Sequence, residues 1–254
     1  NLNAAQQVGI FYGTFTTNNF TINTGTFVST TGCGGCNNRT VNLGSSVINC
    51  SVQWDIFGDA GMTLNTGTST IRTPSFTSSG NATYYNAEMN GSGVNGVDLS
   101  GTVVFNNFDF TAGTALSFSG SLGSGSFTAT NRLGLNRPGS TITFISGSTI
   151  TVNGILDLPN PGAGCSALTT LQTIVPGSPV TISKSSGSVV SSRMSIKDIT
   201  ATGGATFTAN QSVNQGGNSG WTINAPAASS YYWIGATGSW NGGKHWRTSR
   251  RGAA

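Results

Sequence analysis

Charged residues are scarce in this chain of 254 residues, which has 11 lysines and arginines and 7 aspartates and glutamates. Residues 1–230 contain seven basic and seven acidic side chains, so the net charge of +4 comes from Lys244, Arg247, Arg250 and Arg251. A nucleic-acid-binding protein needs a basic face on its folded body. The placement of the charge therefore argues against nucleic acid as a partner.

Long apolar runs are also missing, and no stretch of about 18 hydrophobic residues predicts a membrane span. The chain begins at Asn1 without a basic segment and an apolar segment of the kind that forms a signal peptide. We interpret it as a segment of a longer protein. Because lysine and glutamate are as rare as in secreted surface repeats, we expect a secreted, cell-surface location.

Metal-binding and nucleophilic residues are few. The only histidine, His245, has no evident serine or cysteine partner, so we expect a structural role for it. Cys33-Gly-Gly-Cys36 has the spacing of half a zinc site, but no second pair follows. We expect a local disulfide, or a bond from one of the two to Cys50, which is about one coil away from Cys33. Cys165 is the expected odd cysteine.

Paired carboxylates are equally hard to find. Glycoside hydrolysis needs two carboxylates facing each other across the scissile bond. The closest acids in the sequence are Asp55 and Asp59, and the others are dispersed. We therefore expect a protein without catalytic activity, and the alternative is a β-helical polysaccharide lyase or hydrolase, or a carbohydrate-binding module.

One segment, Gly91–Leu99, resembles a single imperfect copy of the calcium-binding nonapeptide, with Asp98 as its acidic ligand. True examples occur in tandem, because each ion is held between successive coils. We therefore expect no cofactor, with calcium near Asp98 as the weaker alternative.

Short apolar pairs at i and i+2 are the feature that the sequence has in abundance. Val97 and Leu99, Val103 and Phe105, and many similar pairs alternate with turns rich in Gly, Asn, Ser and Thr. Each pair places two side chains on one face of a strand. No helical periodicity competes with this pattern. It predicts an all-β fold with almost no helix.

The strands are too short and too closely spaced for ordinary hairpins, and they fit the rungs of a parallel β-helix, a solenoid. With about 20 residues per coil, residues 1–224 would form roughly ten coils. Two segments interrupt the rhythm, Pro159–Cys165 and Gly80–Gly96, and both are candidates for inserted loops.

Two surface patterns leave binding functions open. Thr-x-Thr recurs and could form an array that matches ice or a crystalline polysaccharide, but the pairs are unevenly spaced, which favours ordinary solvent-facing threonines. Tyr84 and Tyr85 are candidates for stacking on a glycan. The aromatic cluster after residue 230 is expected to pack as an end cap or a joint between modules.

Several segments together resemble a module of very large, repetitive cell-surface proteins of Bacteroidota, including gliding-motility adhesins exported by the type IX secretion system. These segments are Phe15–Ile22, Gly25–Phe27, Arg39–Ser46, Thr63–Ile71, Ser195–Asp198, Thr202–Phe207 and Gly216–Trp221. The stretch Tyr232–Trp246 is similar to the opening of the module that follows in such proteins. Residues 247–254 depart from the continuation that the family would show.

The resemblance implies a right-handed parallel β-helix that acts as a stiff stalk or adhesin segment, with a role in cell adhesion and gliding motility. Its implied partners are neighbouring modules of the same chain and the type IX secretion and motility machinery, with surface polysaccharide as a further candidate. We divide the chain into a β-helix module (1–224), a linker (225–230) and the start of a following module or a cap (231–254). The expected end-cap and joint residues are Trp221, Tyr232, Trp233, Trp240 and Trp246.

Overall fold

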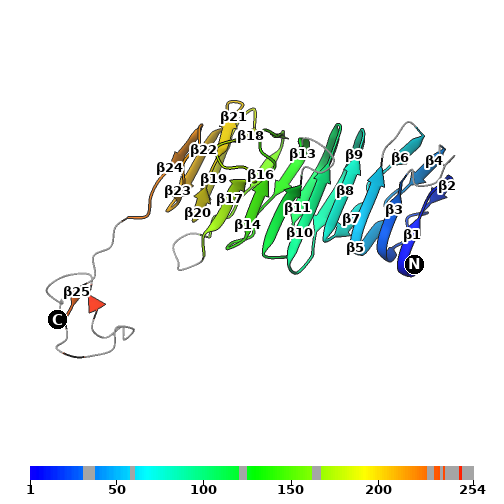
Figure 1. Cartoon of the computed structure of the whole chain (residues 1–254), viewed down its shortest axis with the longest axis horizontal. Helices are drawn as coiled ribbons and strands as arrows, with labels where there is room; N and C mark the ends of the chain where they lie inside the picture. The colour runs from blue at the N-terminus through cyan, green and yellow to red at the C-terminus, as the bar shows by residue number, and fades with distance from the viewer. Residues whose placement is uncertain are drawn as a thin grey trace.

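The computed structural model describes residues 1–30, 38–57, 61–119, 125–161, 167–227, 232–234, 237 and 246–247. Within these ranges all regular elements are strands, and no helix is long and apolar enough to cross a membrane. The strands form a parallel β-solenoid of about 9 turns (Figure 1). The predicted all-β solenoid is therefore confirmed.

The first third of the solenoid contains β1 (Leu2–Gly9), β2 (Gly13–Thr16), β3 (Ile22–Ser29), β4 (Arg39–Asn42), β5 (Val47–Phe57), β6 (Met62–Asn65), β7 (Thr70–Thr73) and β8 (Ser75–Ser79). The middle contains β9 (Ala82–Met89), β10 (Val94–Leu99), β11 (Val103–Phe110), β12 (Ala115–Ser119), β13 (Phe127–Gly134), β14 (Thr141–Phe144), β15 (Thr149–Val152) and β16 (Ile155–Asp157). The last third contains β17 (Thr169–Thr173), β18 (Val180–Ser183), β19 (Ser188–Ser192), β20 (Met194–Ile196), β21 (Ile199–Thr202), β22 (Thr206–Asn210), β23 (Val213–Asn214) and β24 (Trp221–Ile223).

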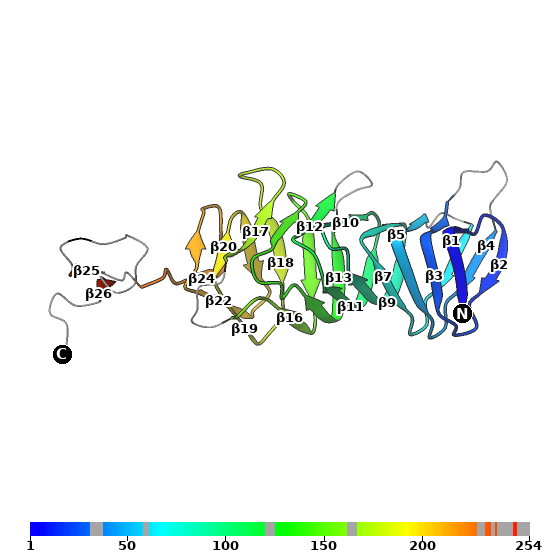
Figure 2. The ribbon, with the colours of Figure 1, turned by 90° about the horizontal axis from the view of Figure 1, so that it is seen from below.

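Each coil contributes to three faces, and the coils stack along one long axis (Figure 2). Face 1 contains the first halves of β1, β3 and β5, then β7, the second halves of β9, β11 and β13, and β16. Face 2 contains the second halves of β1, β3 and β5, then β8, β10, β12, β14, β17, β20 and β23. Face 3 contains β2, β4 and β6, the first halves of β9, β11 and β13, then β15, β18 and β21.

Aromatic rings form a continuous column through the core of the first seven coils. The rings in contact, in order along the axis, are Phe15, Phe27, Trp54, Phe76, Tyr84, Phe105, Phe108, Phe127, Phe118 and Phe144. Their centroids lie 4.8 to 6.4 Å apart, within the range of favourable ring pairs. Some neighbouring rings are register partners in adjacent coils, as Tyr84 and Phe105 are, and others come from successive strands, as Phe76 and Tyr84 do.

Turns also stack from coil to coil. Asn19, Gly44 and Gly67 occupy the same turn in three successive coils, and all three have positive φ angles of 63°, 55° and 55°. The turns are joined by hydrogen bonds, from the Ser45 amide to Oδ1 of Asn19 and from the Thr68 amide to the Gly44 carbonyl. Only glycine and, less often, asparagine adopt this left-handed conformation readily. The Asn and Gly turn signals of the sequence therefore mark equivalent corners of the solenoid.

The prediction of an inserted loop at Gly80–Gly96 is wrong, because β9 runs from Ala82 to Met89 and belongs to the solenoid. Tyr84 is fully buried there, and its hydroxyl is 2.8 Å from Oγ of Ser78. The inward positions of β9 are Tyr84, Ala87 and Met89 rather than pairs of branched residues, so the apolar alternation is weak in the sequence. The other candidate loop, Pro159–Cys165, lies partly outside the described residues.

The last strand of the solenoid, β24, ends at Ile223. Beyond it, β25 (Tyr232–Trp233) and β26 (Trp246–Arg247) form a separate two-stranded antiparallel sheet. Tyr232 pairs with Arg247, and Trp233 pairs with Trp246. This pairing differs from the parallel pairing of the solenoid strands.

Candidate functional site

The two tyrosines predicted to stack on a glycan have different environments. Tyr84 is 0% exposed and lies in the aromatic column, where burial raises its pKa to about 12. A sugar cannot reach its ring, so the prediction is wrong for Tyr84. Tyr85 is 39% exposed, because neighbouring residues of a strand point to opposite sides. Only Tyr85 of this pair remains available to a ligand.

The cysteines do not form the predicted bond to Cys50. Cys50 is a free thiol in β5, where its side chain is 3% exposed. Burial raises its pKa to about 12, while a hydrogen bond with the backbone of Phe27 works in the opposite direction. Such a thiol remains protonated and unreactive at neutral pH. Cys33, Cys36 and Cys165 lie outside the described residues.

Asp55 is the described member of the two acids that are closest in the sequence, which the enzyme alternative would use. It lies on face 2 in β5, and burial raises the pKa of its carboxyl group. Its Oδ1 atom is buried and has no hydrogen-bond partner among the described atoms. A raised pKa is one property of a general acid, but Asp59, the second carboxylate of the pair, and His245 lie outside the described residues.

Asp98, the candidate calcium ligand, lies in β10 and not in a turn. It is in register with Thr77 on one side and Ser119 on the other. The nonapeptide site requires its acidic ligand in a stacked turn, so this segment does not have that geometry. Among the described residues, no group of three or more His, Cys, Asp or Glu side chains is placed to hold a metal ion.

Charged residues from five coils meet on face 1, although they are dispersed in the sequence. Nε of Arg72 lies 2.7 Å from Oε2 of Glu88. Arg132 contacts two carboxylates. Its Nε lies 2.7 Å from Oδ1 of Asp109, and its Nη2 lies 2.7 Å from Oδ2 of Asp157. Glu88 and Asp109 are also register partners on adjacent strands. We call these five residues the charged ladder.

The charged ladder is close to electrical balance. Burial raises the pKa of Asp109, the ion pair with Arg132 lowers it, and the charges of Glu88 and Asp157 raise it further. Half-exposed ion pairs of this kind contribute about 0–1 kcal/mol each to stability. Arg132 joins three successive strands, β11, β13 and β16, and so fixes their side chains on the outer surface. This arrangement fits a structural role.

Threonine and serine side chains form two in-register columns on the outer surface of face 3. One column continues from Thr149 through Thr181 to Thr200, and Ser219 extends it. The second column contains Thr128, Thr151, Ser183 and Thr202. The Thr-x-Thr pairs are unevenly spaced in the sequence, but coils of different length bring them into register. We call these two columns the hydroxyl array.

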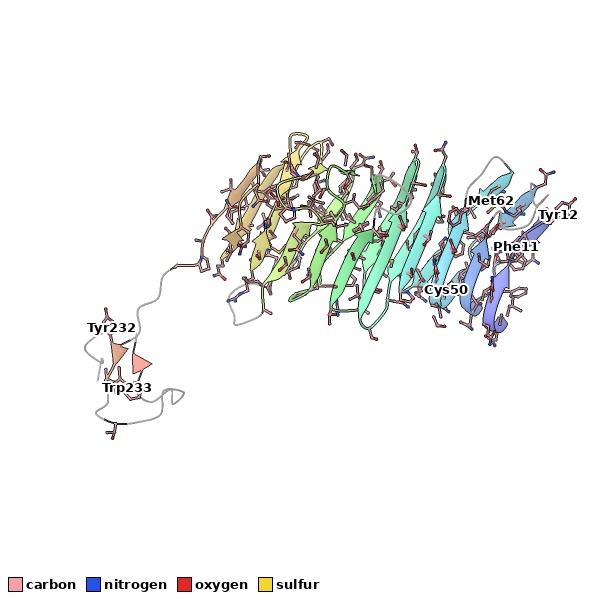
Figure 3. All side chains as sticks on the ribbon, viewed as in Figure 1. Phe11, Tyr12, Cys50, Met62, Tyr232 and Trp233 are labelled. Carbon is pink, nitrogen blue, oxygen red and sulfur yellow. The ribbon has the colours of Figure 1, made fainter. Side chains whose placement is uncertain are left out.

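The N-terminal end of the solenoid is apolar. Among the described strands, β1 pairs only with β3 and β2 pairs only with β4, so both have an unpaired edge. Leu2, Phe11, Tyr12 and Phe20 are 43%, 39%, 74% and 58% exposed near this edge. Figure 3 shows Phe11 and Tyr12 at this end of the molecule.

The proposed end-cap residues are described only in part. The ring of Trp221 packs at a tilt of 58° against Phe207, with ring centroids 5.1 Å apart, and Trp221 is half-buried in the last strand of the solenoid. Tyr232 and Trp233 form β25 (Figure 3). Trp240 and the side chain of Trp246 lie outside the described residues. The cap and joint assignment therefore remains a prediction.

Comparison of the chain with protein-family models, with curated proteins and with solved structures finds no match in any of the three.

Proposed function

We propose that this chain is a non-catalytic structural and adhesive module of a large secreted cell-surface protein, in which it serves as a stiff stalk or adhesin segment. The observation that carries this proposal is the continuous solenoid, in which backbone hydrogen bonds join each coil to the next along one axis. The aromatic column adds an apolar core along the same axis. A rod of this construction can hold a binding surface away from a cell.

The apolar N-terminal end supports the proposal that neighbouring modules are partners. An open sheet edge with exposed aromatic side chains invites pairing with another strand. A coil of a neighbouring module would satisfy the free backbone groups of β1 and β2 and cover Phe11 and Phe20. From the resemblance to gliding adhesins, we also propose the type IX secretion and motility machinery as a partner. The same resemblance suggests a location on the outer surface of the cell.

The enzyme alternative finds less support in the arrangement of the acids. In the charged ladder each carboxylate is within 2.7 Å of a guanidinium nitrogen. Each of these carboxylates already has a basic partner within the fold, which fits a structural ion pair. Within the described part of the chain Asp55 has no such partner, so a test for catalysis should concentrate on this residue.

Two measurements test the proposed function. The coding sequence on both sides of the chain should contain further β-solenoid modules in tandem, and a lone module fused to a catalytic domain would contradict the stalk.

The protein should also release no reducing ends or unsaturated products from a panel of plant and algal polysaccharides. Release that Asp55→Asn abolishes, while Asp98→Asn leaves it unchanged, would establish an enzyme instead.

A second candidate function, adhesion to ice, is favoured by the hydroxyl array. Outward positions on one strand are about 6.6–6.8 Å apart and successive coils about 4.7–4.9 Å apart, repeats similar to those of oxygen atoms on faces of ice. The array is uncharged, and the hydroxyls of Thr149, Thr151 and Thr181 have no hydrogen-bond partner in the described ranges.

Thermal hysteresis and inhibition of ice recrystallisation test this second candidate. The wild-type protein should show both, and Thr151→Tyr should remove most of the activity because the ring lifts the ice surface off the array. Thr170→Tyr is the matched control, since Thr170 is a half-buried outward threonine on face 2. Absence of activity in the wild type, or equal loss in both variants, would exclude ice adhesion through this array.

A further inference from the structure

A groove crosses five successive coils at the corner between faces 1 and 2. It has a volume of about 720 Å³. The residues that line it are Asn3, Ala4, Asn23, Thr24, Gly25, Asn49, Cys50, Ser51, Pro74, Asn90 and Gly91. With one coil every 4.7–4.9 Å, it extends roughly 19 Å along the solenoid axis. We call it the corner groove.

Three asparagines form one wall of the corner groove. They are register partners in β1, β3 and β5. Nδ2 of Asn23 donates to Oδ1 of Asn3 at 2.6 Å, and Nδ2 of Asn49 donates to Oδ1 of Asn23 at 2.7 Å. Each amide keeps a further N–H and a carbonyl lone pair for another partner. Donors and acceptors therefore recur in these three coils and are held in fixed positions before a ligand arrives.

The opposite end of the corner groove is built by a buried asparagine. Asn95 is 0% exposed, accepts a hydrogen bond from the Gly91 amide at 2.7 Å, and donates to the carbonyls of Gly91 and Ala112 at 3.0 Å. These bonds hold Gly91 against Pro74, and a Cβ on Gly91 would lie 2.6 Å from Cβ of Pro74. The ring of Pro74 is thus fixed as an apolar element of the lining.

The chemistry of the lining limits the class of ligand. All eleven lining residues are uncharged. Arg72 is the register partner of Asn49, but it is engaged in the ion pair with Glu88, so the lining favours an uncharged ligand over a phosphate or a uronate. The backbone of β3 is paired on both sides, with β1 and with β5, so a peptide cannot add to it as a strand. Available contacts are amides, the exposed Ser51 hydroxyl and small apolar surfaces such as Pro74. An uncharged sugar chain offers the matching hydroxyls and C–H faces.

We propose that the corner groove binds an extended, uncharged polysaccharide chain lying parallel to the solenoid axis, held by the ladder of Asn3, Asn23 and Asn49. The inference rests on the proposed adhesive function and names the ligand class of that adhesion. The length of the groove accommodates a few sugar units. A repeating ligand fits a repeating wall, since each of the first three coils presents the same amide to the next sugar.

The test is calorimetric titration of the whole chain with neutral hexasaccharides of linear glucan, mannan and xylan, and with hexagalacturonate as the anionic probe. At least one neutral probe should bind, and hexagalacturonate should not. Asn49→Ala should weaken binding about 10-fold through the loss of amide hydrogen bonds. Ser51→Trp should abolish binding, because the indole occupies the groove from an exposed position without disturbing the core.

Asn42→Ala is the matched control. Asn42 is a half-buried amide in a similar ladder on face 3, where Nδ2 of Asn65 donates to its Oδ1 at 2.8 Å, and it lies outside the corner groove. This variant should bind as the wild type does, and melting curves of the three variants show that each is folded. Binding of hexagalacturonate alone, no binding of any neutral probe, or full binding by Ser51→Trp would overturn the inference. Each of these outcomes leaves the stalk intact, whereas cleavage of a probe would overturn the proposed function itself.

Discussion

Replacing Trp54 with alanine is expected to lower the free energy of unfolding by about 3–5 kcal/mol. Trp54 is 0% exposed and contacts three rings, those of Phe27, Phe76 and Tyr84, with centroids at 4.8, 6.4 and 6.2 Å. The substitution would leave a large cavity in the middle of the aromatic column. Rigid paired strands on all faces limit how far the surrounding coils can collapse into it. Urea unfolding followed by circular dichroism measures the change.

Val52→Ala is the control for this prediction, because Val52 lies in the same strand but is 57% exposed. Its free energy of unfolding should stay within about 0.5 kcal/mol of the wild type. Coils of a solenoid interact mainly with their neighbours. Hydrogen exchange in Trp54→Ala should therefore accelerate most in the coils next to β5. If Trp54→Ala lost less than about 1 kcal/mol of unfolding free energy, the packing described for Trp54 would be contradicted. The same holds if Val52→Ala lost as much as Trp54→Ala.

Replacing Gly67 with alanine is expected to cost about 2–5 kcal/mol of unfolding free energy, the second large effect. The left-handed φ of 55° costs about 1–2 kcal/mol for a residue with a Cβ. In addition, the new Cβ would overlap the carbonyl group of Gly44 in the turn below. This neighbour is backbone, so the stacked turns must separate, at a cost of about 1–3 kcal/mol. Chemical denaturation measures the sum.

Gly13→Ala separates the two contributions. Gly13 also has a positive φ, 77°, but a Cβ there would meet no atom within 4 Å. This variant should lose only the conformational contribution, about 1–2 kcal/mol. If Gly67→Ala and Gly13→Ala lost the same unfolding free energy, the close contact between stacked turns would not be a reason for glycine at position 67.

The fold was predictable because its local signals agree with one another. Pairs such as Val97 and Leu99 or Val103 and Phe105 alternate with polar residues, and the structure buries all four. Turn signals such as Asn65-Thr-Gly67 mark corners where a left-handed residue is needed. The right-handed sense of the coil, which the resemblance implied, stays a prediction.

The candidate surfaces were much less predictable, because they depend on which coils become neighbours. Tyr84 was expected on the surface and is in the core, since the weak alternation of β9 conceals its phase. Arg72 and Glu88 are 16 residues apart in sequence and form an ion pair between adjacent strands. Nothing in the sequence indicates that these two residues would lie on adjacent strands.

By itself, the sequence determined that the chain forms short strands with an apolar side, separated by tight turns, because side-chain alternation and left-handed turn residues act within a few positions. Only the tertiary structure decided the lateral neighbours. Ile22 is in register with Ile48, and Ile71 with Ala87, so successive coils differ by several residues in length. Register is set by packing between coils, and no single coil encodes it. The charged ladder, the hydroxyl array and the asparagines of the corner groove all arise at that level.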